Sequence, residues 1–127
     1  MNDRSATPLR LRARLYCGDE IAIGPGKADL LEAIAQTGSI SAAGRLLGMS
    51  YRRTWLLVDA MNRCWQKPLV TTATGGSHGG GAGVTDFGMA VLARYRELQA
   101  AIANASAGPM RELERLMVKE PRAAKKM

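Results

Sequence analysis

The strongest hydrophobic pattern in the chain lies between Ser50 and Trp65. Side chains suited to a protein core recur there every three or four residues, the spacing of one face of an α-helix: Thr54, Leu57, Val58, Met61 and Trp65. Charged residues, including Arg52 and Asp59, fall on the opposite side. The pattern predicts an amphipathic helix that packs one face into the core, with Ser50 capping its first turn.

A shorter helix is predicted immediately before this one, with Ser41 as its N-cap. Small residues over 42–44 would let the two helices approach closely, and Gly48 is suited to the left-handed turn that ends a helix. A short helix, a glycine turn and a second helix that begins with two arginines are typical of a DNA-reading helix-turn-helix. Because similar helix pairs occur in proteins that bind no nucleic acid, the flanking sequence has to decide.

The segment downstream predicts a β-hairpin. Residues 69–73 form a short run with β-branched residues at its centre, which predicts a strand. Six glycines in nine residues follow over 75–83, and Val84 and Thr85 are the second, short strand. A glycine-rich hairpin after a recognition helix is typical of a wing, whose backbone approaches DNA phosphates closely. A nucleotide-binding loop is disfavoured because no Lys-Ser or Lys-Thr follows the glycines. A hairpin tip without a ligand is the remaining alternative.

Two further elements are predicted before the helix pair. Apolar and basic residues alternate from Leu9 to Cys17, which predicts a strand with one apolar and one arginine-rich face. A helix is predicted over Asp29–Gln36, with three side chains facing the core: Leu30, Leu31 and Ile34. This helix would support the helix pair.

A long helix is predicted after the hairpin, with Thr85 as its N-cap. Its apolar stripe has few partners left within the chain and is expected to form a dimer interface: Phe87, Val91, Tyr95, Leu98 and Ile102. The alternative is that the stripe folds back over the N-terminal strand. A break is predicted over 103–109, followed by a short second helical stretch.

These elements predict a mainly α chain with a small β component, a winged helix-turn-helix with a C-terminal dimerisation helix. The expected organisation is a flexible N-terminus over 1–8, the winged helix domain with its long helix over 9–103, a short helical extension over 104–120 and a disordered basic tail over 121–127.

Charge favours an anionic partner. Lys and Arg number 18 against 11 Asp and Glu, so the 127-residue chain carries a formal charge of +7. Five of the basic residues, against the single acidic Asp59, lie over 41–80. No apolar run approaches the roughly 18 residues that span a membrane, and the N-terminus has no apolar signal core, so a cytoplasmic protein without a membrane partner is expected.

Catalytic, metal and cofactor sites are not expected. Cys17 and Cys64 are predicted to be two buried thiols, with a disulfide as the alternative. His78 is the single histidine and lies among glycines, so no familiar zinc spacing is present. The sequence shows no set of polar residues held together for acid-base or nucleophilic catalysis.

The motifs over 37–43, 48–53 and 58–62, then Thr74-Gly75-Gly76 with its glycine cluster and Val84-Thr85, resemble the N-terminal domain of ModE-type molybdate-responsive bacterial repressors. That domain is also similar to the DNA-binding domain of LysR-type regulators. The resemblance extends from about Leu9 to Leu98 and implies a winged helix, double-stranded DNA as partner, dimerisation and transcriptional control. It does not extend to the C-terminal molybdate-binding domains of ModE proteins, so molybdate sensing is not implied.

The predicted function is therefore sequence-specific DNA binding by a homodimeric transcriptional regulator. Base contacts are expected from Ser50, Tyr51, Arg52 and Arg53. The other residues expected at the DNA are Ser41, Arg45, Thr72, Thr74, Gly75, Gly76, Ser77, His78, Gly79 and Gly80. Two alternatives are a protein-interaction module that docks a partner on the long helix, and an oxyanion sensor that binds molybdate across its dimer. The sequence identifies no operator and no effector.

Overall fold

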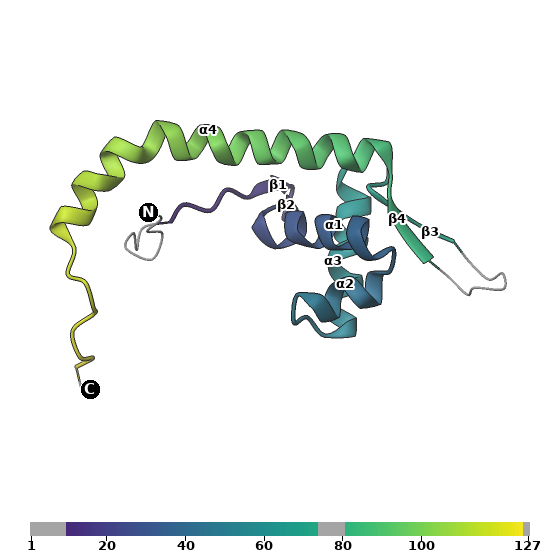
Figure 1. The fold of residues 1–127 in the computed structure, drawn as a ribbon, viewed down its shortest axis with the longest axis horizontal. Helices are drawn as coiled ribbons and strands as arrows, with labels where there is room; N and C mark the ends of the chain where they lie inside the picture. Colours follow the sequence, from purple (N-terminus) through teal and green to yellow (C-terminus); the bar gives the residue numbers. More distant parts are fainter. Residues whose placement is uncertain (1–9, 74–80, 126–127) are drawn as a thin grey trace.

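The computed structural model describes residues 10–73 and 81–125. Within these ranges the chain forms four helices and two small antiparallel sheets, shown in Figure 1. The elements are, in chain order, β1 (Leu15–Cys17), β2 (Glu20–Ile23), α1 (Pro25–Thr37), α2 (Ile40–Leu46), α3 (Tyr51–Cys64), β3 (Val70–Ala73), β4 (Gly81–Val84) and α4 (Asp86–Leu116). The prediction of a mainly helical chain with a small β component is confirmed.

Helix α1 begins earlier than predicted, at Pro25, because proline fits the first helical position, where no amide hydrogen is needed. The three side chains predicted to face the core, Leu30, Leu31 and Ile34, are all fully buried. The helix ends at Gly38, which adopts a left-handed conformation (φ 71°) and donates its amide hydrogen to the carbonyl of Ile34.

Helix α2 is capped by Ser39, so the prediction that Ser41 caps it is wrong. The Ser39 hydroxyl accepts a hydrogen bond from the amide of Ala42 (3.0 Å), whereas Ser41 lies within the first turn. The two other predicted features of this region are confirmed. Gly48 is left-handed (φ 72°), and the Ser50 hydroxyl caps α3 by accepting from the amide of Arg53 (3.1 Å).

Helices α2 and α3 cross closely at Gly44. A Cβ atom on Gly44 would lie 2.1 Å from the hydroxyl oxygen of Thr54, so only glycine fits there. Thr54 is fully buried, and its hydroxyl donates a hydrogen bond to the carbonyl of Ser50 (2.7 Å). The expected close approach of the two helices is therefore observed, and Gly44 is the residue that permits it.

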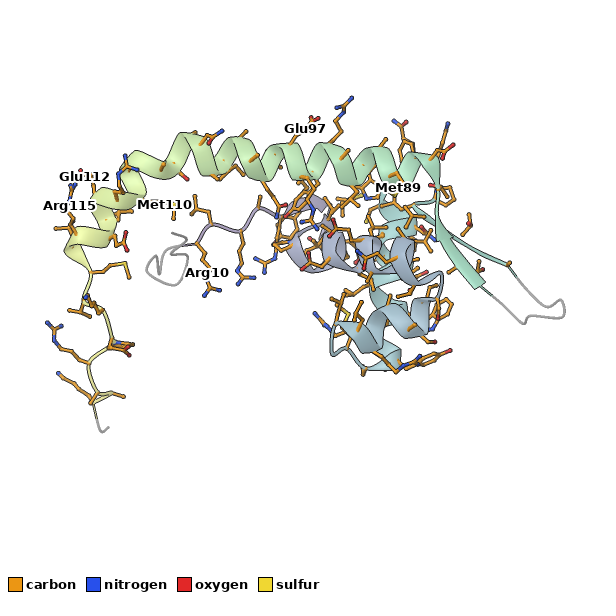
Figure 2. All side chains as sticks on the ribbon, viewed as in Figure 1. Arg10, Met89, Glu97, Met110, Glu112 and Arg115 are labelled. Atoms are coloured by element: carbon orange, nitrogen blue, oxygen red, sulfur yellow. The ribbon has the colours of Figure 1, made fainter. Side chains whose placement is uncertain are left out.

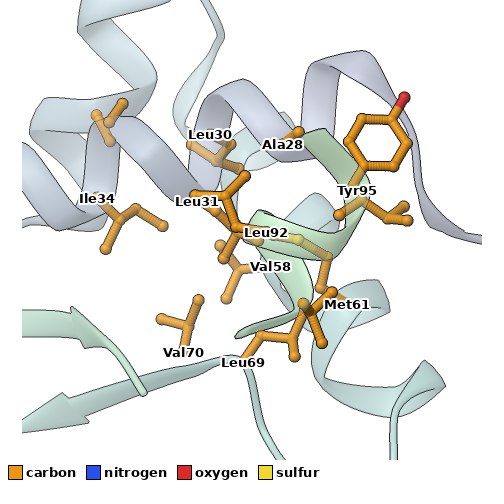
Figure 3. Close-up of a cluster of buried hydrophobic side chains, with 14 of the residues drawn as sticks. Ala28, Leu30, Leu31, Ile34, Val58, Met61, Leu69, Val70, Leu92 and Tyr95 are labelled. Carbon is orange, nitrogen blue, oxygen red and sulfur yellow. The ribbon is translucent and has the colours of Figure 1, made fainter. Parts of the chain in front are cut away.

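The core lies between the three N-terminal helices, β3 and the first half of α4 (Figure 3). Thr54, Val58 and Met61 of α3 are buried as predicted, while Leu57 and Trp65 are partly buried against the core. Other elements contribute further buried side chains: Leu30, Leu31, Ile34, Leu69, Val70, Leu92 and Tyr95. The indole nitrogen of Trp65 donates to the carbonyl of Ala22 (3.1 Å) and ties the end of α3 to β2.

The long N-terminal strand predicted from Leu9 to Cys17 is wrong. Among the described residues of this segment only Leu15–Cys17 forms a strand, because the chain turns back at Gly18 (φ 59°) into β2, which has only four residues before α1 begins. The predicted apolar face is not buried: Leu11 and Leu15 are exposed. The buried side chains of this hairpin belong to β2, a strand that was not predicted.

The predicted hairpin is present as β3 and β4, with Val70 paired to Val84 and Ala73 to Gly81. The second strand lies earlier than expected, over Gly81–Val84, and Thr85 serves only as the predicted cap of α4. Its hydroxyl accepts from the amide of Gly88 (2.8 Å). The residues between the strands lie outside the described ranges.

Helix α4 is continuous through Leu116 with Pro109 inside it, so the predicted break over 103–109 is wrong. Its second half extends beyond the body formed by the other helices (Figure 1). Figure 2 shows Glu97 projecting from α4 on one side and Met110 on the other, toward the N-terminal segment that carries Arg10. Among the described residues, no helix combines the length and the apolar character required to cross a membrane.

The apolar stripe of α4 has more partners within the chain than expected. Val91 and Tyr95 are buried in the chain's own core, and the Tyr95 hydroxyl donates to the carbonyl of Ala13 (2.7 Å). Arg96 forms ion pairs with Asp29 (3.1 Å) and Glu32 (2.7 Å) of α1. The first half of α4 is therefore fixed to the body.

The two cysteines differ in their surroundings. Cys17 is exposed, so the prediction of two buried thiols is wrong for it, whereas Cys64 is half-buried; both are free. Burial raises the pKa of the Cys64 thiol, and the neighbouring Cys17 thiol raises it further. A raised pKa keeps Cys64 protonated and weakly nucleophilic near neutral pH.

Candidate nucleic-acid interface

The predicted base-contacting residues all lie at the start of α3. Tyr51, Arg52 and Arg53 form its first turn and are exposed, as is the capping residue Ser50. The first turn contains no acidic residue. In Figure 1, α2 and the start of α3 lie on the side of the body remote from α4. The turn therefore presents hydrogen-bond donors and positive charge to solvent.

The arginines of α2 and α3 divide into paired and unpaired groups. Arg63 is held by Asp59 (2.8 Å) and Glu20 (3.2 Å), and these hydrogen bonds raise the pKa of its guanidinium. Arg45, Arg52 and Arg53 form no ion pair with any described residue. Arg63 therefore adds little free charge, and the unpaired arginines of these two helices lie around the α2–α3 turn.

Aromatic side chains accompany these cations. The rings of Tyr51 and Trp55 lie 6.2 Å apart, centroid to centroid, and both side chains are exposed. Trp55 was not among the predicted contact residues, although its four-residue spacing from Tyr51 places both on the same helix face. Leu46 and Leu56 add exposed apolar area on the same two helices. Such side chains suit contact with thymine methyl groups and sugar rings.

The residues expected at the phosphate backbone are only partly described. Arg45 is exposed in the last turn of α2, Thr72 is exposed in β3, and Ser41 is half-buried in α2. The remaining predicted contacts lie outside the described residues: Thr74, Gly75, Gly76, Ser77, His78, Gly79 and Gly80. The sheet formed by β3 and β4 projects from one side of the body (Figure 1).

An apolar groove runs along the first half of α4. It is lined by Leu15, Ile23, Trp65, Phe87, Ala90, Val91, Arg94, Tyr95 and Leu98. Of the predicted dimer residues, Leu98 is exposed, Phe87 and Ile102 are half-buried, and Val91 and Tyr95 are buried within the chain. Of the five predicted residues, Leu98, Phe87 and Ile102 therefore retain surface that a second molecule can contact.

No metal-binding cluster is found in the described part of the chain, where no three His, Cys, Asp or Glu side chains gather suitably.

No family model matches the chain. Over 95 residues it is 37% identical to the molybdenum transport protein ModE of Azotobacter vinelandii, covering 73% of this chain and 35% of that protein. It is 36% identical over 87 residues to the DNA-binding transcriptional dual regulator ModE of Escherichia coli (strain K12), covering 68% of this chain and 31% of that protein. It is 46% identical over 81 residues to the molybdenum-pterin-binding protein MopB of Rhodobacter capsulatus, covering 64% of this chain and 30% of that protein. The chain thus spans about a third of the length of these curated relatives.

Proposed function

We propose that this chain, a relative of the ModE-type regulators over most of its length, is a transcriptional regulator that binds double-stranded DNA sequence-specifically through a winged helix-turn-helix. Helices α2 and α3 would form the helix-turn-helix, and β3 with β4 the wing. The observation that carries the proposal is the exposed first turn of α3, where Arg52 and Arg53 have no carboxylate partner among the described residues. A regulator of this kind is not an enzyme.

In the proposed complex α3 enters the major groove with its first turn foremost. Guanidinium groups there are suited to the paired acceptors of guanine, and Tyr51 and Trp55 to apolar contact with thymine. Arg45 and Thr72 lie on elements that flank α3 and would contact phosphates, which fix the register without reading sequence.

Replacing Arg52 by alanine tests the proposed base contact. With a duplex selected from a random pool by the parent protein, we expect a loss of about 1–3 kcal/mol of binding free energy and relaxed preference at one base pair. The matched control is Arg115→Ala, because Arg115 is exposed at the far end of α4 and already paired with Glu112. Unchanged affinity and unchanged sequence preference in both Arg52→Ala and Arg53→Ala would contradict the proposed role of α3.

Dimerisation is the second part of the proposal. Two recognition helices must lie about 34 Å apart to read successive major grooves on one face of DNA. The apolar groove on α4 offers a surface through which two copies would pack around a two-fold axis. Leu98 lies in this groove, near the middle of α4, and its side chain is exposed.

The substitution Leu98→Asp is expected to weaken the dimer. A carboxylate desolvated at the interface without a partner costs several kcal/mol, which corresponds to about 100-fold or more in the dimer dissociation constant. Leu116→Asp is the matched control, because Leu116 is 82% exposed at the end of the same helix. Light scattering at micromolar concentration measures the outcome, and a monomeric parent protein would contradict the dimer.

Molybdenum binding is a second candidate function, because MopB is named for molybdenum-pterin binding. The glycine-rich segment that would supply backbone amides to an oxyanion lies largely outside the described residues. The described cations at α3 are better suited to an extended polyanion, so DNA binding remains the proposal.

A further inference from the structure

A recess lies at the N-terminus of α1, between the N-terminal segment and α3. Its volume is about 280 Å³. Four cationic side chains line it, with no carboxylate among the lining residues: Arg12, Arg14, Lys27 and Arg53. These four residues come from three separate segments, the N-terminal segment, α1 and α3, and the fold brings them together.

Lys27 is the unusual member of this group. Only 8% of its surface is exposed, and it forms no hydrogen bond or ion pair through its ammonium group with any described residue. Burial lowers the pKa of Lys27, with Arg53 and Arg14 acting in the same direction. Glu20, whose charge acts in the opposite direction, is already ion-paired with Arg63. No described side-chain nitrogen is buried without a hydrogen-bond partner, so the Lys27 ammonium itself reaches the solvent in the recess. Its charge has no carboxylate partner there and is available to an anion.

The backbone at the recess adds further donors. α1 is 13 residues long, and its N-cap Gly24 has no side chain to satisfy the first amides. The amides of Gly26 and Lys27 precede the first hydrogen bond of the helix, which Ala28 donates to Gly24 (2.9 Å). A Cβ on Gly26 would meet no atom within 4 Å, so the space beside these amides is open. Free amides at the positive end of a helix attract anions.

We propose that this recess binds a phosphate-type oxyanion, with the Lys27 ammonium and the first amides of α1 as direct partners and Arg12, Arg14 and Arg53 around its mouth. Lys27 carries the proposal, because its side chain is largely buried and its ammonium has no ion-pair partner among the described residues. The recess, whose charged lining residues are all cationic, gives the anion a place. Two sources supply this chemistry: a free oxyanion such as inorganic phosphate, and a phosphodiester of bound duplex. The second source rests on the proposed function.

The first experiment titrates sodium phosphate into the full chain at constant ionic strength and follows backbone amide resonances. We expect the Gly26 and Lys27 amides to shift saturably. In Lys27→Met, which keeps an apolar stem but removes the charge, the saturable shift of Gly26 should be lost. Lys119→Met is the matched control, because Lys119 is exposed beyond the end of α4.

Arg12→Gln is a second variant. Because Arg12 is exposed, this substitution does not disturb the core. It should weaken phosphate binding without removing it. In phosphate-free buffer, Lys27→Met should melt at or above the temperature of the parent, and added phosphate should raise Tm only when Lys27 is present.

The second experiment measures duplex affinity against salt. If a backbone phosphate occupies the recess, Lys27→Met should reduce the slope of log affinity against log salt by about 1, while Lys119→Met should not change it. A saturable shift with an unchanged slope assigns the recess to a free oxyanion; a reduced slope without a shift assigns it to the DNA backbone. If Lys27→Met changes neither the titration nor the slope, the proposal is overturned. If the parent binds no duplex, the proposed function fails, and the phosphate titration alone shows whether the recess binds an oxyanion.

Discussion

Gly44→Ala is expected to destabilise the chain more than any other single methyl addition in α2. The new Cβ would lie 2.1 Å from the hydroxyl oxygen of Thr54 and 2.9 Å from its Cγ2, so α2 and α3 must separate. Overpacking of this kind costs about 3 kcal/mol, equivalent to roughly 10 °C in Tm. Thermal unfolding followed by circular dichroism measures the effect.

Gly26→Ala is the matched control, because it makes the same change in a helix, α1, where the new Cβ would meet no atom within 4 Å. Alanine is the better helix former by about 1 kcal/mol, so this variant should be unchanged or more stable. Equal stability of Gly44→Ala and the parent would show that α2 and α3 are not in close contact at Gly44.

Asn62→Ala is expected to detach α3 from β3. The Asn62 side-chain oxygen accepts hydrogen bonds from the amides of Leu69 (2.9 Å) and Val70 (3.1 Å), and its nitrogen donates to the carbonyl of Val70 (3.0 Å). Leu69 and Val70 are buried, so their backbone groups would lose partners without gaining water. The expected loss of unfolding free energy is about 2–4 kcal/mol in a denaturant titration.

The control is Asn104→Ala, since Asn104 is exposed on α4 and its loss should change stability by less than about 0.5 kcal/mol. Asn62→Asp adds a finer test, because a carboxylate still accepts from both amides but cannot donate to Val70. Its stability should fall between those of the parent and Asn62→Ala. If Asn62→Ala unfolds like Asn104→Ala, the hydrogen bonds from Asn62 do not hold α3 and β3 together.

Local signals explain which elements the sequence could predict. The apolar spacing of α3 and the conformational demand at Gly48 are properties of the residues themselves, so both were predicted correctly. The resemblance to ModE-type regulators, carried by the same motifs, is confirmed by the relatives. The alternation over 9–17 is equally regular, but a strand needs a partner, and the short strand β2 pairs with only three of these residues, Leu15–Cys17.

The failures at Ser41 and in α4 have different causes. Two serines stand at the start of α2, and the turn at Gly38 makes Ser39 the extended residue that precedes it (φ −149°). A proline inside a helix removes one backbone hydrogen bond and usually ends the helix, but α4 continues through Pro109 to Leu116.

Of the two candidate sites, one could be predicted from the sequence and the other could not. The exposed arginines of α3 could be predicted because helical spacing places them away from the core. The role inferred for Lys27 could not, since lysine is ordinarily exposed and nothing in its neighbourhood along the chain marks it as buried. Its surroundings come from β2 and α3 as well as from α1, and only the fold brings these elements together.

The exposed cations at the start of α3 are proposed to bind duplex DNA. The most direct test is fluorescence anisotropy of a labelled duplex titrated with the full chain, repeated from about 50 to about 200 mM salt. Because Arg45, Arg52 and Arg53 would each displace counterions, the account predicts a slope of log affinity against log salt steeper than about −2 per protomer. Absence of duplex binding at micromolar protein, or an affinity that does not change with salt, would contradict the claim and favour a protein-interaction module.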